Sequence, residues 1–185
     1  SSPQAIEDNM GVDATGQVFN SIVAVEQYKG AEMNPLVNAG AIASTSMVSG
    51  KSREEIWNKI LNYYGDFAGR KLTVNEEVFK SEAETNQRNQ AIGKLMYAYG
   101  RIKDNPDQAT DIYTEQWSVN VNARDLATMA ATLAAEDRRF YSHPGVDPLA
   151  LVRATWHNLR ARRMVEGGST ITQQAVKQLI ARPRT

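Results

Sequence analysis

Residues 122–136 read NARDLATMAATLAAE, and this stretch predicts a helix. Asn122 with Asp125 three residues later is typical of a helix start, because such side chains accept hydrogen bonds from the free backbone N–H groups of the first turn. The apolar residues that follow recur at helical spacing: Leu126, Met129, Ala130, Leu133 and Ala134. This stripe runs up to Ala135, where the composition of the chain changes.

The change in composition divides the chain at Ala135. Up to that residue there are 12 Lys and Arg against 17 Asp and Glu, whereas from Glu136 onward there are 9 against 4. The net charge of zero is therefore a cancellation between two unlike parts. Asn falls from twelve residues to one across the same point. We expect residues 1–135 and 136–185 to be two different sequences joined within one helix.

Helix signals dominate the first part. Ser52-Arg53-Glu54-Glu55 reads as a capping box, in which the Ser and Glu side chains each satisfy a free N–H group. Apolar residues then recur every four positions until Gly65, which we expect to end the helix. A second helix, over Ile92, Leu95, Met96 and Tyr99, is expected to end at Gly100.

Further helices are expected at several points. Asn34-Pro35 opens one of small residues over 38–49, whose lack of bulk permits close packing. After the division, Asp147-Pro148 begins another, and Ser169 begins a last one that ends at Pro183. The only candidate strands are residues 21–27 and 72–74. The fold class is therefore mainly α, with few or no strands.

Composition excludes several kinds of site. There is no Cys and there are only two His residues, so we expect no metal site, and nothing in the sequence suggests a cofactor. No signal peptide or transmembrane segment is visible, and the chain as given is expected to be cytoplasmic. We expect no nucleic-acid binding, because the arginines at 160, 162 and 163 are typical of a solvated helix end.

Four segments before Ala135 carry more polar side chains than a helical core requires: Gln17–Ser21, Asn34–Gly40, Ser81-Glu82 with Arg88-Asn89, and Asp111–Tyr113. Asn donates and accepts, Glu is a charged acceptor and Tyr offers a hydroxyl, which are the groups needed to hold an amino acid. Glu82 and Asn89, seven residues apart, would share one face of a single helix. Helix caps and solvated faces are the alternative interpretation.

These segments resemble the serine-dependent glutaminases, a family related in fold to β-lactamases. The resemblance covers residues 11–134, including Asn122–Ala127, and implies the helical lobe of that fold. It implies that the substrate glutamine is bound by four residues: Asn38, Glu82, Asn89 and Tyr113. The family places its nucleophile in a Ser-x-x-Lys motif, yet no Lys of this chain follows a Ser by three residues. Because amide hydrolysis needs an activated nucleophile, we expect weak or no activity.

Residues 136–185 carry a second resemblance. Glu136-Asp137 followed by Phe140 and His143, and the later Gly167–Gln174, match the peptidoglycan glycosyltransferase domain of bifunctional penicillin-binding proteins. That domain has a lysozyme-like helical fold and is periplasmic and membrane-associated. The resemblance implies that Glu136 is the catalytic base. It also implies that a lipid-linked disaccharide and its diphosphate are held by Ser169, Thr170, Gln174 and Lys177.

Together the two resemblances predict a chimera of a glutaminase fragment and the first helices of a glycosyltransferase domain. Two alternatives remain open at this stage. One is a helical scaffold without enzymatic activity, and the other is a partial glycosyltransferase that binds lipid-linked disaccharide. Each part would lack partners for its apolar faces, so we also expect self-association into a homo-oligomer.

Overall fold

The computed structural model describes residue 11 and residues 16–31 and 33–136. These residues form seven helices and no strand apart from one isolated antiparallel bridge between Val74 and Val119, which confirms a mainly helical fold. None of these helices has the length and apolar character needed to cross a membrane. The helices are α2 (Ile22–Tyr28), α3 (Asn38–Ser46), α4 (Arg53–Ala68), α5 (Glu76–Thr85), α6 (Gln87–Ala98), α7 (Pro106–Gln116) and α8 (Ala123–Glu136).

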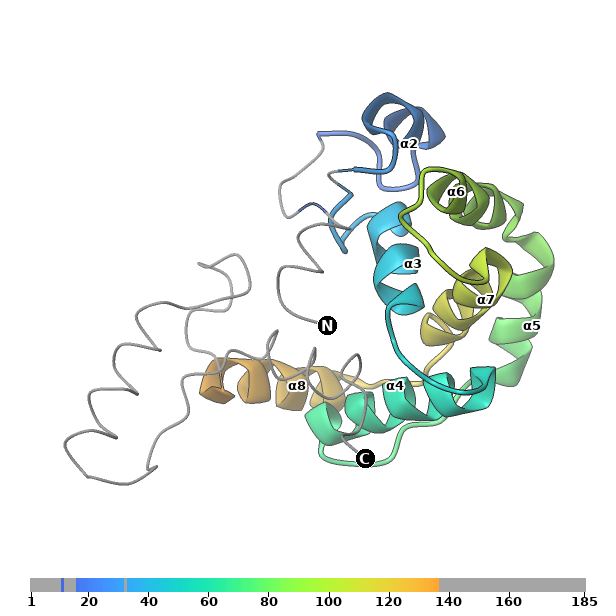
Figure 1. The fold of residues 1–185 in the computed structure, drawn as a ribbon. Coiled ribbons are helices and arrows are strands. Elements are labelled where there is room, and N and C mark those ends of the chain that lie inside the picture. Colours follow the sequence, from blue (N-terminus) through green and yellow to red (C-terminus); the bar gives the residue numbers. More distant parts are fainter. Residues whose placement is uncertain (1–10, 12–15, 32, 137–185) are drawn as a thin grey trace, which may run out of the picture.

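The centre of this helical body is the packing of α3 against α6 and α7 (Figure 1). α2 covers one end of α6, α5 packs on α7, and α4 crosses below α7. The main apolar core lies between α2, α3, α6 and α7, and a smaller cluster lies between α4 and α7. The side chains buried completely or nearly so in the main core include Val25, Met33, Ile42, Ile92, Met96 and Ile102.

Two glycines permit the close approach of elements in this core. A Cβ at Gly40 of α3 would collide with the backbone carbonyl of Asn34, and a Cβ at Gly93 of α6 would collide with the hydroxyl of Thr110 on α7. Asn34 is itself buried, and its side chain accepts a hydrogen bond from the N–H of Leu36 at 2.9 Å. The predicted use of small residues for close packing is therefore confirmed for α3.

The ends of α4 correct part of the prediction. Ser52 caps the helix by accepting from the N–H of Glu55 at 3.2 Å, as expected. The Glu55 carboxylate instead accepts from the N–H of Lys51 at 2.9 Å. The predicted stop at Gly65 is wrong, because the helix continues to Ala68. It ends at Gly69, whose φ of 68° is the left-handed conformation that glycine adopts without strain.

Neither candidate strand forms a sheet. Residues 21–27 belong largely to α2, which Ser21 caps by accepting from the N–H of Ala24 at 3.1 Å. Residues 72–74 contribute only the bridge at Val74, with backbone bonds from Asn120 to Thr73 and from Asn75 to Ser118. The apolar run in α2 is short, from Ile22 to Val25, so its pattern did not separate a strand from a short helix.

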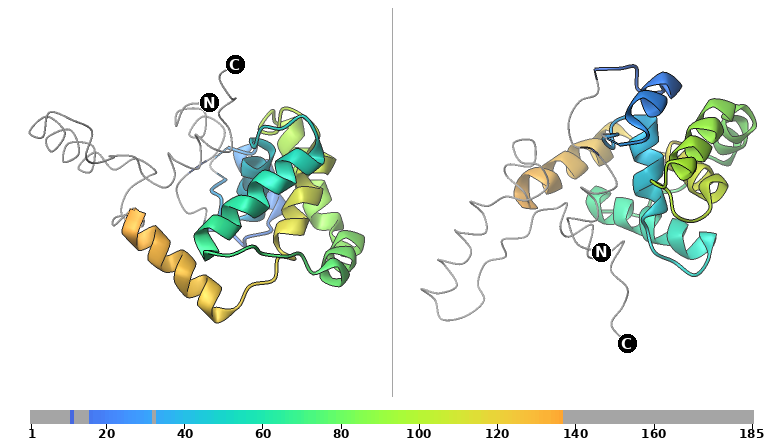
Figure 2. Two further views of the ribbon diagram at one scale, coloured as in Figure 1. Left: turned by 90° about the horizontal axis from the view of Figure 1, so that it is seen from below. Right: turned by 45° about the horizontal axis from the view of Figure 1, so that its top comes forward.

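α8 begins as predicted and contacts the C-terminal end of α4, where the Thr132 hydroxyl donates to the carbonyl of Phe67 at 3.4 Å (Figure 2). Asn122 and Asp125 exchange hydrogen bonds, each side chain accepting from the other's backbone N–H at 3.0 and 2.9 Å. The expected apolar stripe is only partly covered, since Leu126 is 55% exposed and Ala130 is also exposed. The helix continues through Ala135 to Glu136, so the backbone at the predicted boundary is helical. The helices predicted after it lie outside the described residues.

Candidate functional site

The structure brings together two of the four residues predicted to bind an amino acid. Asn38 is the first residue of α3 and Asn89 lies in the first turn of α6. The Nδ2 atom of Asn38 donates to Oδ1 of Asn89 at 2.7 Å, and both side chains are half-buried. Neither amide serves as a helix cap, because α3 has no side-chain cap and the residue before α6 is Asn86. The alternative interpretation of these two residues as caps is therefore wrong.

The loop before α2 accepts hydrogen bonds from the residues around this pair. The backbone N–H of Asn38 donates to the carbonyl of Phe19 at 2.8 Å. The guanidinium of Arg88, next to Asn89, donates to the carbonyl of Asn20 at 3.4 Å. The segment 17–21 and the starts of α3 and α6 therefore meet, as three of the predicted polar segments would require for one site.

Tyr113 lies on α7 and is only 5% exposed. It belongs to the same apolar cluster as Ala39, which follows Asn38, and Ile92, which lies one turn after Asn89. Its ring meets Trp117 edge to face at 5.9 Å. Burial raises the pKa of Tyr113, while its contact with Trp117 opposes the shift. The hydroxyl therefore remains protonated at neutral pH and is suited to hydrogen bonding rather than to proton abstraction.

Glu82 lies on α5, not on the helix that carries Asn89. The chain breaks at Asn86, between Thr85 and Gln87, so the prediction that both residues share one face of a single helix is wrong. The Glu82 side chain is exposed, and its carboxylate has no hydrogen-bond partner among the described residues. The hydrogen bonds of the described residues connect neither Glu82 nor Tyr113 with the Asn38–Asn89 pair.

The residues of the second predicted site lie at or beyond the end of the described residues. Glu136 is the last residue of α8, and only its helical backbone is described. The remaining residues predicted for that site lie outside the described residues: Ser169, Thr170, Gln174 and Lys177.

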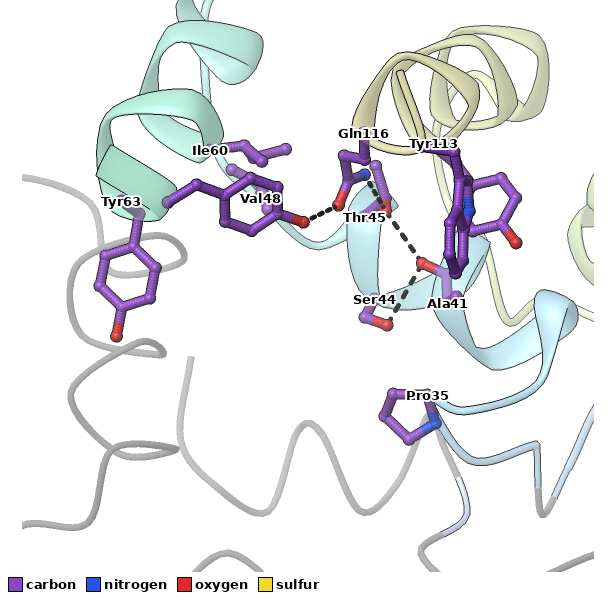
Figure 3. A pocket seen from close by; sticks show the side chains of 11 residues that line it. Pro35, Ala41, Ser44, Thr45, Val48, Ile60, Tyr63, Tyr113 and Gln116 are labelled. Carbon is purple, nitrogen blue, oxygen red and sulfur yellow. Dashed lines mark hydrogen bonds between the residues drawn. The ribbon is translucent and has the colours of Figure 1, made fainter. Parts of the chain in front are cut away.

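A cavity of about 360 Å³ opens beside Tyr113, between α3, α4 and α7 (Figure 3). A chain of hydrogen bonds crosses its wall, from the Tyr64 hydroxyl to Gln116 Oε1 at 2.7 Å, from Gln116 Nε2 to Thr45 Oγ1 at 2.9 Å, and from Thr45 to the carbonyl of Ala41 at 2.9 Å. No sequence pattern indicates this network, because Gln116 is 52 residues from Tyr64 and 71 residues from Thr45 in the chain. The other lining residues are Pro35, Ser44, Val48, Ile60, Tyr63, Tyr113 and Trp117.

Asp111, from the fourth predicted polar segment, is bound by a structural ion pair. Arg53 of α4 donates from Nε to Asp111 at 2.6 Å and from Nη2 to Glu115 at 2.5 Å. Arg53 also lies 6.0 Å from the ring centre of Phe79. Burial raises the pKa of Glu115, and Arg53 opposes this shift. Asp111 therefore connects α7 to α4. Among the described residues, no group of three acidic or His side chains could hold a metal ion.

Comparisons with known proteins identify relatives of this chain. The sequence model of the glutaminase family matches residues 1–155, a range that ends beyond Ala135. Glutaminase 2 of Yersinia pestis is 47% identical over 146 residues, which cover 79% of this chain and 41% of that protein. The glutaminase of Colwellia psychrerythraea is 43% identical, covering 83% of this chain and 51% of its own length. The chain thus spans about half the length of the curated relatives it matches.

Solved structures of glutaminases also resemble this chain over part of their length. A probable glutaminase, ybaS, superposes with a TM-score of 0.71 at 38% identity, covering 90% of this chain and 48% of that one. A Bacillus glutaminase superposes with a TM-score of 0.69 at 28% identity, covering 72% and 45%. The helical arrangement around α3, α6 and α7 is therefore similar to one part of these larger structures.

Proposed function

Since this chain belongs to the glutaminase family, we propose that its described helices form the part of a glutaminase that binds the substrate amino acid. The observation that supports this most directly is the hydrogen bond between Asn38 and Asn89. It joins two amides that are 51 residues apart in the chain. An amide pair that caps no helix and is only half-buried has donors and acceptors left for a ligand.

The remaining hydrogen-bonding capacity of the pair suits an α-amino acid. Asn38 uses one N–H of its amide on Asn89, which leaves its carbonyl oxygen and its second N–H. Asn89 keeps both of its N–H donors for a carboxylate. We propose that the exposed carboxylate of Glu82 binds the substrate ammonium group and that the Tyr113 hydroxyl contributes a neutral hydrogen bond.

We further propose that these 185 residues bind glutamine or glutamate but hydrolyse glutamine weakly or not at all. Hydrolysis of an amide needs an activated nucleophile, and no Lys in the sequence follows a Ser by three residues. A glutamine hydrolysis rate well above the buffer rate, and abolished in Glu82→Ala, would contradict this part of the proposal.

Binding is tested by calorimetric titration of the chain with glutamate. We expect a single site that is lost in Asn89→Ala and in Asn38→Ala, whereas Asn58→Ala, an exposed Asn on α4, leaves it unchanged. Glu82→Gln is expected to weaken binding while Glu84→Gln, also exposed on α5, does not. At saturating glutamate the free energy of unfolding should rise by roughly 1 kcal/mol or more. No heat and no shift would favour a scaffold without a ligand site.

A second proposal rests on the motifs after Ala135. Glu136 and the segment Gly167–Gln174 resemble a glycosyltransferase motif, and we propose on this resemblance that this part binds a lipid-linked disaccharide. The test is polymerisation of that substrate by the chain. Activity that is lost in Glu136→Gln but kept in Glu166→Gln would support it, and no binding of the substrate would contradict it.

A further inference from the structure

Asn86 lies at the junction between the helices that carry Glu82 and Asn89. It ends α5 and directly precedes the first residue of α6, with φ −89° and ψ 24°. The chain changes direction at this residue. The relative placement of Glu82 and Asn89 therefore depends on the conformation of Asn86.

The side chain of Asn86 connects this junction to α7. Its Nδ2 atom donates to Oγ1 of Thr114 at 2.9 Å, and its Oδ1 atom accepts from Nε2 of Gln90 at 2.6 Å. Thr114 is buried and directly follows Tyr113. One amide group thus joins α6, one turn from its start, to the turn of α7 that carries Tyr113.

The hydrogen-bonding pattern requires an amide at this position. The Thr114 hydroxyl uses its only proton on the carbonyl of Thr110 at 2.9 Å, so its oxygen can only accept. The group that faces Thr114 must therefore donate, while the group that faces the Gln90 amide must accept. Asn meets both requirements, whereas Asp would place one oxygen against another.

The side chain of Asn86 does not cap α6, although Asn at this position usually does. An Asn that precedes a helix normally accepts a hydrogen bond from a backbone N–H of the first turn. Asn86 makes no such cap, although Asn75 and Asn105 do so for α5 and α7. Its side chain bonds to Thr114 of α7 instead, so it holds the start of α6 against α7 rather than capping the helix.

We propose that Asn86 is a positioning residue for the amino-acid site. It holds the start of α6 against α7 and so fixes where Asn89 meets Asn38, without touching the substrate itself. This inference rests on the proposed function in one respect, which is that the Asn38–Asn89 pair binds the substrate.

The test compares Asn86→Ala and Thr114→Val with Gln87→Ala. Gln87 spans the same junction through a bond from Nε2 to the carbonyl of Glu84 at 2.8 Å, but it is exposed and this bond stays within the junction. Loss of one buried hydrogen bond corresponds to a change in Kd of about 2- to 10-fold. We expect glutamate to bind more weakly by about that factor in Asn86→Ala and Thr114→Val, and the double variant to lose no more than either alone.

All titrations are made well below the unfolding temperature of each variant, so that lost stability alone leaves Kd unchanged. Gln87→Ala is expected to keep the wild-type Kd. Thr114→Val nearly conserves the volume of the side chain, so this variant carries the test if Asn86→Ala does not fold. Wild-type Kd values in both Asn86→Ala and Thr114→Val would overturn the inference.

A second measurement separates this inference from the proposed function. The side-chain amide resonance of Asn38 reports its hydrogen bond to Asn89. We expect that resonance to move in Asn86→Ala and Thr114→Val but not in Gln87→Ala. If the wild-type chain binds no glutamate, the proposed function fails, while a moved resonance still supports the positioning role. An unmoved resonance overturns the positioning role whether or not glutamate binds.

Discussion

The Tyr64 hydroxyl, in the wall of the cavity, should make the fold sensitive to alkaline pH. It donates to Gln116 at 2.7 Å, and burial raises the pKa of Tyr64 to about 12. Above pH 10 the unfolded chain loses this proton while the folded chain keeps it, so stability falls between about pH 10 and pH 12. A shift of about two units corresponds to roughly 2–3 kcal/mol.

Tyr64→Phe is therefore expected to lower stability at pH 8 by about 1 kcal/mol, through the lost hydrogen bond, and to reduce the further loss at high pH. Urea unfolding at pH 8 and pH 11 measures both effects. Tyr97→Phe is the control, because Tyr97 is half-exposed on the same chain. An equal alkaline loss in the wild type and in Tyr64→Phe would show that Tyr64 is not the group responsible.

Arg53 is expected to stabilise the fold mainly by pairing the buried Glu115. Arg53→Ala would leave that carboxylate unpaired, at a cost of about 1–2 kcal/mol, less than for a fully buried pair because Arg53 is partly in water. Burial already raises the pKa of Glu115 and Arg53 opposes this, so removing Arg53 raises it further. The cost should therefore shrink as the pH falls and Glu115 becomes protonated.

Urea unfolding of Arg53→Ala at pH 7.5 and pH 5 tests this dependence. The control is Lys94→Met, which breaks the pair between Lys94 and Asp107, where both side chains are more than half exposed, and it should leave stability nearly unchanged at both pH values. A loss in Arg53→Ala that is the same at both pH values would assign the effect to packing rather than to charge.

At the scale of single residues, a hydrogen bond joins Asn38 with Asn89, whereas Glu82 lies on a different helix from Asn89. The two Asn residues stand in recognisable motifs and make a hydrogen bond across helices. The spacing of Glu82 and Asn89 implied one helix, and the break at Asn86 could not be read from it, because Asn is common both within and between helices. Asn86 itself gave no signal, since its role depends on Thr114, 28 residues away.

At the scale of elements, capping residues were the most reliable signals. Ser52 and the pair Asn122–Asp125 both begin the helices predicted for them. The start of α7 carries the same kind of signal, because Asn105 caps the helix and Pro106 is its first residue. Glycine proved less reliable as a stop, because Gly65 lies inside α4, while Gly69 after the helix takes the left-handed conformation.

The close contact between α3 and the preceding loop gives a prediction for Gly40. A Cβ there would collide with the backbone carbonyl of Asn34, which cannot move as a flexible side chain would. Gly40→Ala is therefore expected to destabilise the fold by about 1–3 kcal/mol, the usual cost of overpacking a core. Thermal unfolding followed by circular dichroism measures the loss.

Gly100→Ala supplies the comparison for that substitution. Gly100 has a φ of 71° and nothing within 4 Å of an added Cβ, so it reports only the backbone cost of about 1 kcal/mol. A Gly40→Ala variant that is no less stable than the wild type would show that the loop at Asn34 gives way.

At the scale of the whole molecule, the arrangement of helices could not be derived from periodicity. The amphipathic patterns predicted helices, but the pairing of α6 with α7 depends on small residues such as Gly93 that allow these two helices to approach. Residues 137–185, with the motifs of the second predicted site, lie outside the described residues, so the domain boundary at Ala135 remains a prediction.

The exposed apolar residues near the amide pair argue for self-association. Leu36 is 91% exposed and Phe19 is 60% exposed. The backbone carbonyl of Phe19 accepts a hydrogen bond from the N–H of Asn38, two residues after Leu36. Exposed apolar side chains favour association, because contact removes them from water. We expect sedimentation velocity to show a mass that rises with protein concentration. The double variant Leu36→Ser with Phe19→Ser should lower that mass, whereas Val121→Ser, on the loop before α8, should not. A constant monomer mass in the wild type would contradict the expectation and leave this face open to a ligand approaching Asn38.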